Sequence, residues 1–414
     1  MSSESTLTIP NVFRRDAMVI SVVGFAHGTS HFFQLMLPPL FPWLMSAYSL
    51  SYTHSGTLMT VFYVVSGTGQ ALAGFLVDRW GAHRVLCLGV ALLASSGILV
   101  AAAPALWGLY LAAFVAGAGN SVFHPADYAL LNHRVSQPRL GHAFSVHGLS
   151  GNVGWALAPL AMTTVATAFG WRTAGLFAAI TGAASLSALW WKREELADEW
   201  IDEQTGRPTR RQQSSSVGIG TLMKLKLTWF AFGFFFFSTL VFGALQNFAP
   251  SLLRDLYGLS LGAATSALTA YLAGGAAGLA AGGFLVSAEK GQEKVVAVSF
   301  LVSAAFALLL AFSVVPGWAV LGIMPLMGFG VGIAGPSRDM LVRRSAAARL
   351  GTGAFGRIYG LVYSGLDAGL ATAPLIFGML MDAGRPRFVF TGVFISLLIA
   401  IVAAQAVAAE AEKA

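Results

Sequence analysis

The chain has 414 residues, of which 56% are hydrophobic and only 10% charged, and its formal net charge is +7. A soluble protein has roughly a quarter of its residues charged, so this composition excludes an ordinary soluble enzyme or binding domain. The single cysteine, Cys87, excludes an intrachain disulfide and a cysteine-rich metal framework. Because apolar segments of about 20 residues recur along the chain, we predict a protein that crosses a membrane many times.

Twelve helical spans fit the apolar pattern, which predicts an all-α membrane protein. In the first half we expect spans at about residues 16–45, 53–77, 84–103, 105–131, 141–168 and 171–191. In the second half we expect spans at about residues 227–252, 260–286, 295–315, 317–341, 353–381 and 387–409.

The positions of lysine and arginine predict the orientation, because cytoplasmic loops carry the excess of these residues. One side of this layout holds only Arg172, Arg254, Arg385 and Arg387. The remaining basic residues outside the spans, among them Arg14, Arg79 and Lys192, fall on the other side. We therefore expect both termini in the cytoplasm and the chain in the cell inner membrane. The positive charge follows this topology, so it does not indicate a nucleic-acid partner.

The segment 192–226 is the one stretch that is charged, polar and rich in serine, and it divides the chain nearly in half. We therefore predict an N-terminal six-helix bundle over 1–191, a cytoplasmic linker over 192–226 and a C-terminal six-helix bundle over 227–414.

The two halves also resemble each other. "AGFLVDRWGAHRV" (73–85) aligns with "GGFLVSAEKGQEKV" (282–295), and "HPADY" (124–128) aligns with "GPSRD" (335–339). Two further segments align in the same order, which is what a duplicated unit would give. Duplicated helical halves with a site at their interface are typical of transporters, in which one half rocks against the other.

The motif "GFLVDRWGAHR" is similar to the loop between spans 2 and 3 of the major facilitator superfamily. Its matching residues are Asp78, Arg79, Gly81 and Arg84, in which Gly81 permits a tight turn. The resemblance covers nearly the whole chain. It implies two pseudo-symmetric six-helix bundles, the major facilitator fold, and a loop that latches the cytoplasmic side.

Within that superfamily, "FHPAD" (123–127) and "GHAFSVHGLSGNVG" (141–154) resemble the fosmidomycin-resistance type of exporter. The resemblance implies proton-coupled export of a small compound. At His31, however, that group carries an acidic residue in our alignment, and the arginine typical of drug–proton antiporters in span 4 is replaced by Ala113.

Ionisable and polar residues inside spans are functional candidates. At about 1.5 Å per residue, His27, His31 and Asp367 lie near the middle of their spans, as does Asn152, the repeat partner of Asp367. We predict that these four residues serve proton coupling or substrate binding. Residues nearer the cytoplasmic ends are predicted to form a gate together with the loop motif, and they are His124, Asp127, His147, Arg338, Asp339 and Arg357. In the gate we expect Asp127 to pair with Arg338, and Pro125 and Pro336 to break their helices.

The cavity wall is expected to include Gln34 in span 1 and Phe242, Gln246 and Asn247 in span 7. Aromatic and amide side chains suit a bulky, partly apolar solute. His27, His31, His124 and Asp127 have the ligand types that divalent metal ions bind. No second acidic cluster supports a metal, and we expect neither a metal nor another cofactor.

The favoured hypothesis is a monomeric carrier in the lipid bilayer that exports a small organic compound in a proton-coupled way. The alternative is proton-linked uptake of a small organic anion, with Arg338 or Arg357 as the counter-charge. A sensor that binds a ligand without moving it is a third, disfavoured reading. An enzyme is not expected, because the sequence has no nucleophile elbow or phosphate-binding loop.

Overall fold

The computed structural model describes residues 9–196, 223–285, 291–350 and 355–413. Within these ranges the side chains of Asp339, of 342–350 and of 355–361, which include Arg357, and a few others lie outside the description, as does most of the linker, 197–222. The described residues form helices and their connections, without β-strands.

Helices follow one another along the whole described chain. In the first half they are α1 (Ile9–Gln34), η1 (Pro38–Leu40), α2 (Phe41–Tyr48), α3 (Tyr52–Trp80), α4 (Ala82–Ala102), α5 (Leu106–Asn120), α6 (Phe123–Arg134), η2 (Gln137–Arg139), α7 (Leu140–Phe169), α8 (Trp171–Trp191) and α9 (Arg193–Leu196). In the second half they are α11 (Lys226–Tyr257), α12 (Leu261–Leu285), α13 (Gln292–Ala311), α14 (Gly317–Leu350), α15 (Phe355–Asp382) and α16 (Arg387–Glu412).

Among the described residues, ten helical segments are long and apolar enough to cross a membrane, with α5 and α6 together counted as one. The helices α1 and α7, at the places of expected spans 1 and 5, have 26 and 30 residues but are not among the ten. Each of these helices carries two histidines and at least one amide residue within its length. Polar residues inside long helices of such a protein indicate a surface that faces a cavity rather than lipid.

The structure corrects two of the predicted spans. The first span was predicted to run to residue 45, but α1 ends at Gln34, before the proline pair Pro38 and Pro39. Proline lacks the N–H that a continuing helix needs, so the chain turns through η1 and restarts as α2. Span 4 is likewise interrupted at Ser121 and Val122 between α5 and α6.

The predicted pair of proline breaks is wrong. Pro125 lies in the first turn of α6, where a missing N–H costs nothing, so the break precedes it. Pro336 lies inside α14, which continues past it to Leu350. The interruption therefore occurs in the first half and has no counterpart in the described part of the second half.

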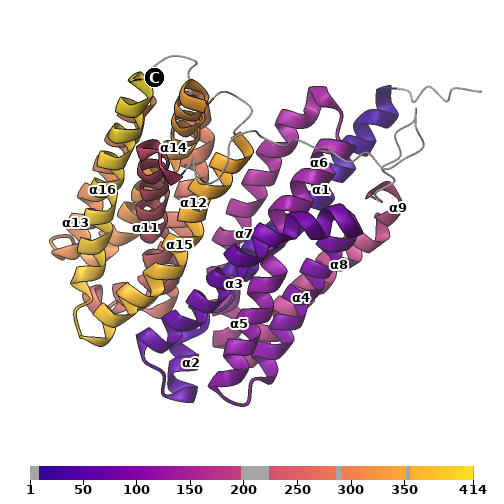
Figure 1. Cartoon of the computed structure of the whole chain (residues 1–414). Coiled ribbons are helices and arrows are strands. Elements are labelled where there is room, and N and C mark those ends of the chain that lie inside the picture. The colour runs from indigo at the N-terminus through magenta and orange to yellow at the C-terminus, as the bar shows by residue number, and fades with distance from the viewer. Residues whose placement is uncertain (1–8, 197–222, 286–290, 351–354, 414) are drawn as a thin grey trace, which may run out of the picture.

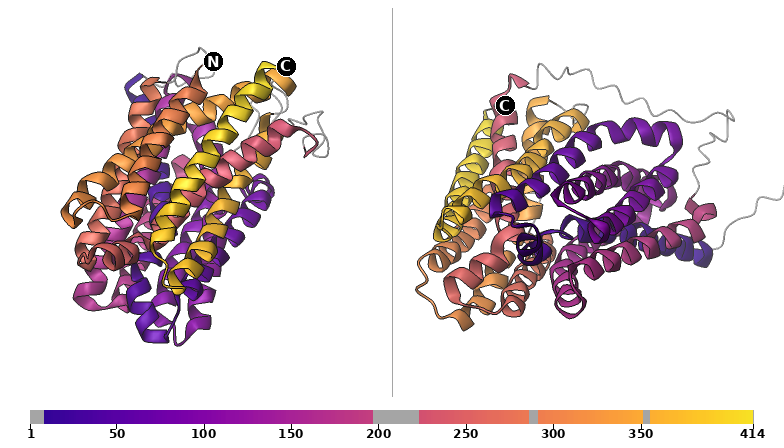
Figure 2. Two further views of the ribbon diagram at one scale, coloured as in Figure 1. Left: turned by 90° about the vertical axis from the view of Figure 1, so that its left-hand side faces the viewer. Right: turned by 90° about the horizontal axis from the view of Figure 1, so that it is seen from below.

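The helices fall into two groups that lean apart (Figure 1). The helices α1 to α9 lie on one side, and α11 to α16 lie on the other. The helix α1 begins and α16 ends at the same end of the molecule (Figure 2), which we call the terminal face. The groups lie closest near α2, at the end that we call the opposite face, and farthest apart at the terminal face.

Contacts across the two groups concentrate toward the opposite face. The Thr60 hydroxyl of α3 donates to the Ala371 carbonyl of α15 at 2.7 Å, and the Thr163 and Thr265 hydroxyls of α7 and α12 lie 3.4 Å apart. Glycine permits one such approach, because a Cβ at Gly56 would collide with the backbone of Pro374. These contacts hold the two groups of helices against each other between the middle of the bundle and the opposite face.

Candidate functional site

A cavity of about 660 Å³ lies between the two groups of helices. Its first-half wall is largely polar and consists of His27, His31, Gln34, Tyr63, Ser66, Gln70, Asn120, His124, Tyr128, His147, Gly148, Asn152 and Trp155. Its second-half wall is mostly apolar and consists of Thr239, Phe242, Gln246, Leu272, Gly275, Leu279, Val331, Gly332, Gly335, Arg338, Leu366, Asp367 and Leu370.

Asp127 organises the histidines of the polar wall. Its Oδ2 atom lies 3.1 Å from His27 Nδ1 and 3.0 Å from His147 Nε2, and its side chain is fully buried. The rings of His27 and His147 are stacked, with centroids 3.5 Å apart. Asp127 is thus held behind the two imidazoles rather than on the cavity wall, and it joins α6 to α1 and α7.

Two further histidines belong to this cluster. His124 Nδ1 lies 3.0 Å from Gln70 Oε1, and its ring centroid lies 5.4 Å from that of His27. His31, one turn along α1, lies 4.4 Å from His27 and 4.3 Å from the Trp155 ring, measured between ring centroids. The structure therefore brings together residues that were predicted to belong to two separate sites, a coupling site and a gate.

A chain of amide hydrogen bonds continues the polar wall beyond His31. Trp155 Nε1 donates to Gln34 Oε1 at 3.0 Å, and Gln34 Nε2 donates to Asn120 Oδ1 at 3.1 Å. Asn120 Nδ2 then donates to Ser66 Oγ at 2.7 Å. This chain crosses α7, α1, α5 and α3, so it fixes the orientation of Gln34 in the cavity. Asn152 also lines the cavity, and its Nδ2 donates to the Gly148 carbonyl at 2.9 Å.

The apolar wall is aromatic at its centre. The Phe242 ring of α11 lies 6.1 Å from the Trp155 ring and 6.0 Å from the Tyr271 ring, measured between centroids. Gln246 is 1% exposed, and neither of its amide atoms has a hydrogen-bond partner among the described residues. Asn247 was predicted to line the cavity, but it is not part of the wall. It is buried, and its Nδ2 donates to the Gly243 carbonyl at 2.7 Å.

Asp367 is the carboxylate of the second-half wall. It lies where α15 packs on α3, and a Cβ at Gly67 would come within 2.9 Å of Asp367 Cβ and 3.2 Å of Oδ2. Asp367 therefore lies at the contact between the two halves.

The residues predicted to form a gate lie in different places. In the loop motif, Gly81 has a φ of 85°, which places it in the region that favours glycine, whereas Asp78, Arg79 and Arg84 are exposed at the terminal face. The opposing segment 286–290 lies outside the described residues, as do the side chains of Asp339 and Arg357.

Arg338 lines the cavity, and its guanidinium carbon lies 4.7 Å from the centroid of the Phe235 ring. Asp127 does not form the predicted ion pair with Arg338. It is buried within the first half, where its partners are His27 and His147. A carboxylate so enclosed is not available as a surface partner for the second half.

Several members of the wall were not predicted from the sequence, notably Ser66, Gln70, Asn120 and Trp155. Gln70 and Asn120 are amides inside apolar segments, so the rule that flagged the histidines would also have flagged them. Nothing in the local sequence marks Trp155, because its position depends on how α7 packs against α1.

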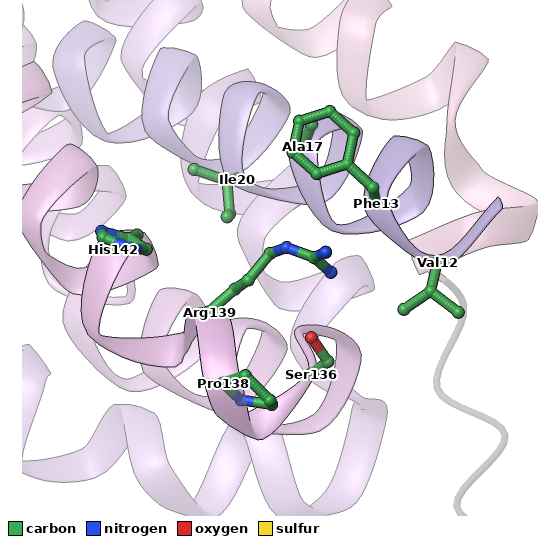
Figure 3. Close-up of a pocket in the computed structure, with 8 residues that line it drawn as sticks. All are labelled: Val12, Phe13, Ala17, Ile20, Ser136, Pro138, Arg139 and His142. Carbon is green, nitrogen blue, oxygen red and sulfur yellow. The ribbon is translucent and has the colours of Figure 1, made fainter. Parts of the chain in front are cut away.

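A second pocket of about 710 Å³ lies beside the beginning of α1, next to η2 and the start of α7 (Figure 3). Arg139 lies between α1 and the start of α7 in this view, with its guanidinium carbon 5.1 Å from the centroid of the Phe13 ring. Arg139 Nη1 also donates to Asp16 Oδ2 at 3.0 Å. The ion pair neutralises the basic group, so we assign this pocket a packing role.

Comparisons with known proteins agree with this geometry. The chain is 26% identical over 375 residues to an uncharacterized MFS-type transporter of Bacillus subtilis, which covers 88% of this chain and 87% of the relative. It is 25% identical over 316 residues to the fosmidomycin resistance protein of Escherichia coli, which covers 75% and 74% respectively. A membrane sensor protein of Salmonella typhimurium is 26% identical over 184 residues, which covers 44% of this chain and 40% of the relative.

The family model of the Major Facilitator Superfamily matches residues 23–356, which include both walls of the cavity up to Arg338. The apolar helices, the two groups of helices and the central cavity fit that family, whose members are secondary transporters. The chain therefore belongs to the Major Facilitator Superfamily.

Proposed function

We propose that this membrane transporter exports a small organic compound in exchange for protons. The observation that carries the proposal is the composition of the cavity, which sets a polar histidine and amide wall against an aromatic wall that holds one carboxylate, Asp367. We further propose that the protein is a monomer in the cell inner membrane with both termini in the cytoplasm.

The two walls favour an amphipathic substrate. A cavity of about 660 Å³ is within the range of roughly 300–1,000 Å³ that holds drug-sized ligands. Phe242 and the leucines of the second half would contact the apolar part of such a compound. Gln246, whose amide atoms have no partner among the described residues, and Gln34 would bind its polar groups.

Asp367 is the proposed proton carrier. It faces the cavity from the second half and lies against Gly67 of the first half. A charged carboxylate is costly inside a closed membrane bundle, so a proton must accompany Asp367 whenever the halves close over an empty cavity. Exchange of that proton for substrate would couple the two fluxes.

Alternating access follows from the way the halves touch. The described contacts hold the opposite face together, while the cavity lies between the halves on the terminal side of those contacts. With the termini in the cytoplasm, this arrangement is an inward-facing state. Export would require the halves to rock until the opposite face opens.

Export rather than uptake is supported by the relative named for fosmidomycin resistance and by the amphipathic cavity. The second candidate is proton-linked uptake of a small organic anion, which is favoured by the cation of Arg338 on the cavity wall. The sensor-like relative adds a third outcome that the test must recognise, namely ligand binding without flux.

The test begins with a resistance and uptake screen in a transporter-deficient host, with and without a proton uncoupler. Compounds that score are then assayed in vesicles of known orientation under an imposed pH gradient. Export predicts that substrate moves against the direction of proton flow, and uptake predicts that both move together. Binding without flux in either gradient would overturn the transport assignment.

A further inference from the structure

The histidine cluster of the polar wall also has the features of a metal site, which the transport proposal does not require and the family assignment does not imply. His27 and His31 of α1 and His124 of α6 each offer one ring nitrogen, and these atoms lie within 4.8 Å of one another. All three residues line the cavity. A tetrahedral site with metal–nitrogen bonds of about 2.0 Å separates its ligand atoms by about 3.3 Å, so modest side-chain rotations would close the set around an ion.

The neighbours of two of these histidines orient them as metal ligands are usually oriented. Asp127 Oδ2 accepts a hydrogen bond from Nδ1 of His27, so the lone pair on Nε2 of that ring is available to a metal ion. Gln70 Oε1 accepts a hydrogen bond from Nδ1 of His124, so the lone pair on Nε2 of His124 is available in the same way. A carboxylate or amide oxygen on the far ring nitrogen is the arrangement that holds a metal-binding imidazole in its tautomer.

His31 supplies an independent observation. It is 8% exposed, and no side chain among the described residues pairs with either ring nitrogen; a weak contact with the Gly151 backbone is all that the ring makes. A buried polar group without a good hydrogen-bond partner is unfavourable. A metal ion at the meeting point of the three rings would satisfy it.

Gly151 keeps this meeting point clear. A Cβ at Gly151 would lie 2.7 Å from His31 Nδ1 and 3.0 Å from His27 Nε2. Any larger residue on this face of α7 would therefore push both imidazoles out of position.

The ligand set selects the kind of metal. Imidazole nitrogens suit zinc, cobalt, nickel and copper, whereas magnesium and calcium prefer oxygen ligands. A second group, His27, Asp127 and His147, also has closely spaced ligand atoms. There the ligand atoms hydrogen-bond to one another through Asp127, so they already have partners.

We propose that His27, His31 and His124 bind one divalent transition-metal ion on the cavity wall. Asp127 and Gln70 orient two of the ligands. Three protein ligands leave a coordination position that can face the cavity, where water or a donor atom of a bound compound would complete the site.

The test uses the full-length protein, purified in detergent and stripped with a chelator. Titration with Zn²⁺ by calorimetry and with Co²⁺ by visible absorption is expected to show one ion per chain and the intense bands of a tetrahedral nitrogen-rich site. His31→Gln is the key variant, because His31 has no hydrogen-bond partner in the described part of the chain to lose. We expect its affinity for Zn²⁺ to fall at least tenfold, and that of Asp127→Asn to fall about 10–100-fold.

The control is His142→Gln, which removes an exposed histidine at the start of α7. It should bind the metal as the wild type does. Absence of stoichiometric binding in the wild type would overturn the proposal, and so would unchanged affinity in His31→Gln. If a variant fails to elute as a folded species, the Co²⁺ spectrum of the wild type still decides between a nitrogen-rich site and none.

Discussion

The carboxylate of Asp382, at the end of α15, accepts a 2.7 Å hydrogen bond from the backbone N–H of Tyr52, 330 positions earlier in the chain. Its second oxygen accepts from the N–H of Thr53 at 2.9 Å. A residue of the second half thus caps the first turn of α3 in the first half. A negative charge at a helix N-terminus is favourable because it meets unpaired N–H groups and the positive end of the helix dipole.

Asp382→Ala should weaken the closure of the opposite face. Loss of a cap costs about 0.5–2 kcal/mol, typically about 1, and 1 kcal/mol changes a population ratio about fivefold. The measurement is the distribution of distances between spin labels at Ser46 and Ala383 in a Cys87→Ala background, and we expect a larger share of long distances in the variant.

The matched control is Ser260→Ala. Ser260 Oγ accepts from the N–H of Ala263 at 3.2 Å and so caps α12 within the second half alone. This variant should leave the distance distribution unchanged. An equal shift in both variants would mean that general loosening, and not the contact between halves, is responsible.

Asp127→Ala should strongly destabilise the fold. Removal of one partner from a buried charged or hydrogen-bonded cluster typically costs about 3–5 kcal/mol, and here it leaves His27 Nδ1 and His147 Nε2 without their acceptor. Thermal unfolding followed by tryptophan fluorescence in detergent should show a clearly lower midpoint. Glu194→Ala, whose side chain is 86% exposed, should unfold with the wild-type midpoint. A wild-type midpoint for Asp127→Ala would refute the assigned role.

Gly154→Ala should destabilise the contact between α1 and α7. The added Cβ would collide with the Gly28 backbone, and such overpacking typically costs about 1–3 kcal/mol. Gly148→Ala is the control on the same helix, because its Cβ would meet nothing within 4 Å. Since alanine is the better helix former, by up to about 1 kcal/mol, the control should be as stable as the wild type or more so. The same unfolding assay ranks the two, and the reverse order would contradict the packing described.

Asp367→Asn should abolish proton-driven transport while leaving substrate binding largely in place. Asparagine keeps the size and polarity of the side chain but does not carry the proton. In vesicles, substrate accumulation driven by a pH gradient should fall at least about tenfold. That factor corresponds to a loss of about 1.4 kcal/mol of coupling between proton and substrate. Equilibrium binding of the substrate should change much less. Glu194→Gln serves as a control on an exposed carboxylate. Transport with an unchanged pH dependence in Asp367→Asn would remove Asp367 from the mechanism.

The membrane-spanning character and the family motif were predictable from local pattern. Runs of apolar residues, the charge distribution around "GFLVDRWGAHR" and the positive φ required at Gly81 depend on near neighbours in the chain. Helix limits were accurate where a glycine or a charged pair ends the segment, as at Trp171–Trp191. They failed at Gln34, where the helix ends before the pair Pro38 and Pro39, and at Ser121, where hydropathy does not register the interruption between α5 and α6.

Which polar residues act together was not predictable in the same way. Depth along a span ranked His27 and His31 with Asp367, and His124, Asp127 and His147 with the gate. The tilt and packing of α1, α6 and α7 instead place Asp127 between His27 and His147. Asn247 shows the opposite error, since one residue further along α11 than Gln246 it turns from the cavity into the helix packing.

By itself, the sequence determined that this chain crosses a membrane as helices, because lipid requires long apolar segments whose backbone groups pair internally. The sequence also determined which residue types are available for function, because each polar side chain inside an apolar segment can be identified without knowing its neighbours in space. Only the tertiary structure decided their partners, the two chemically different walls and the face at which the halves close. Those features depend on the rotation and tilt of each helix against its neighbours, which are set by contacts between residues far apart in the chain.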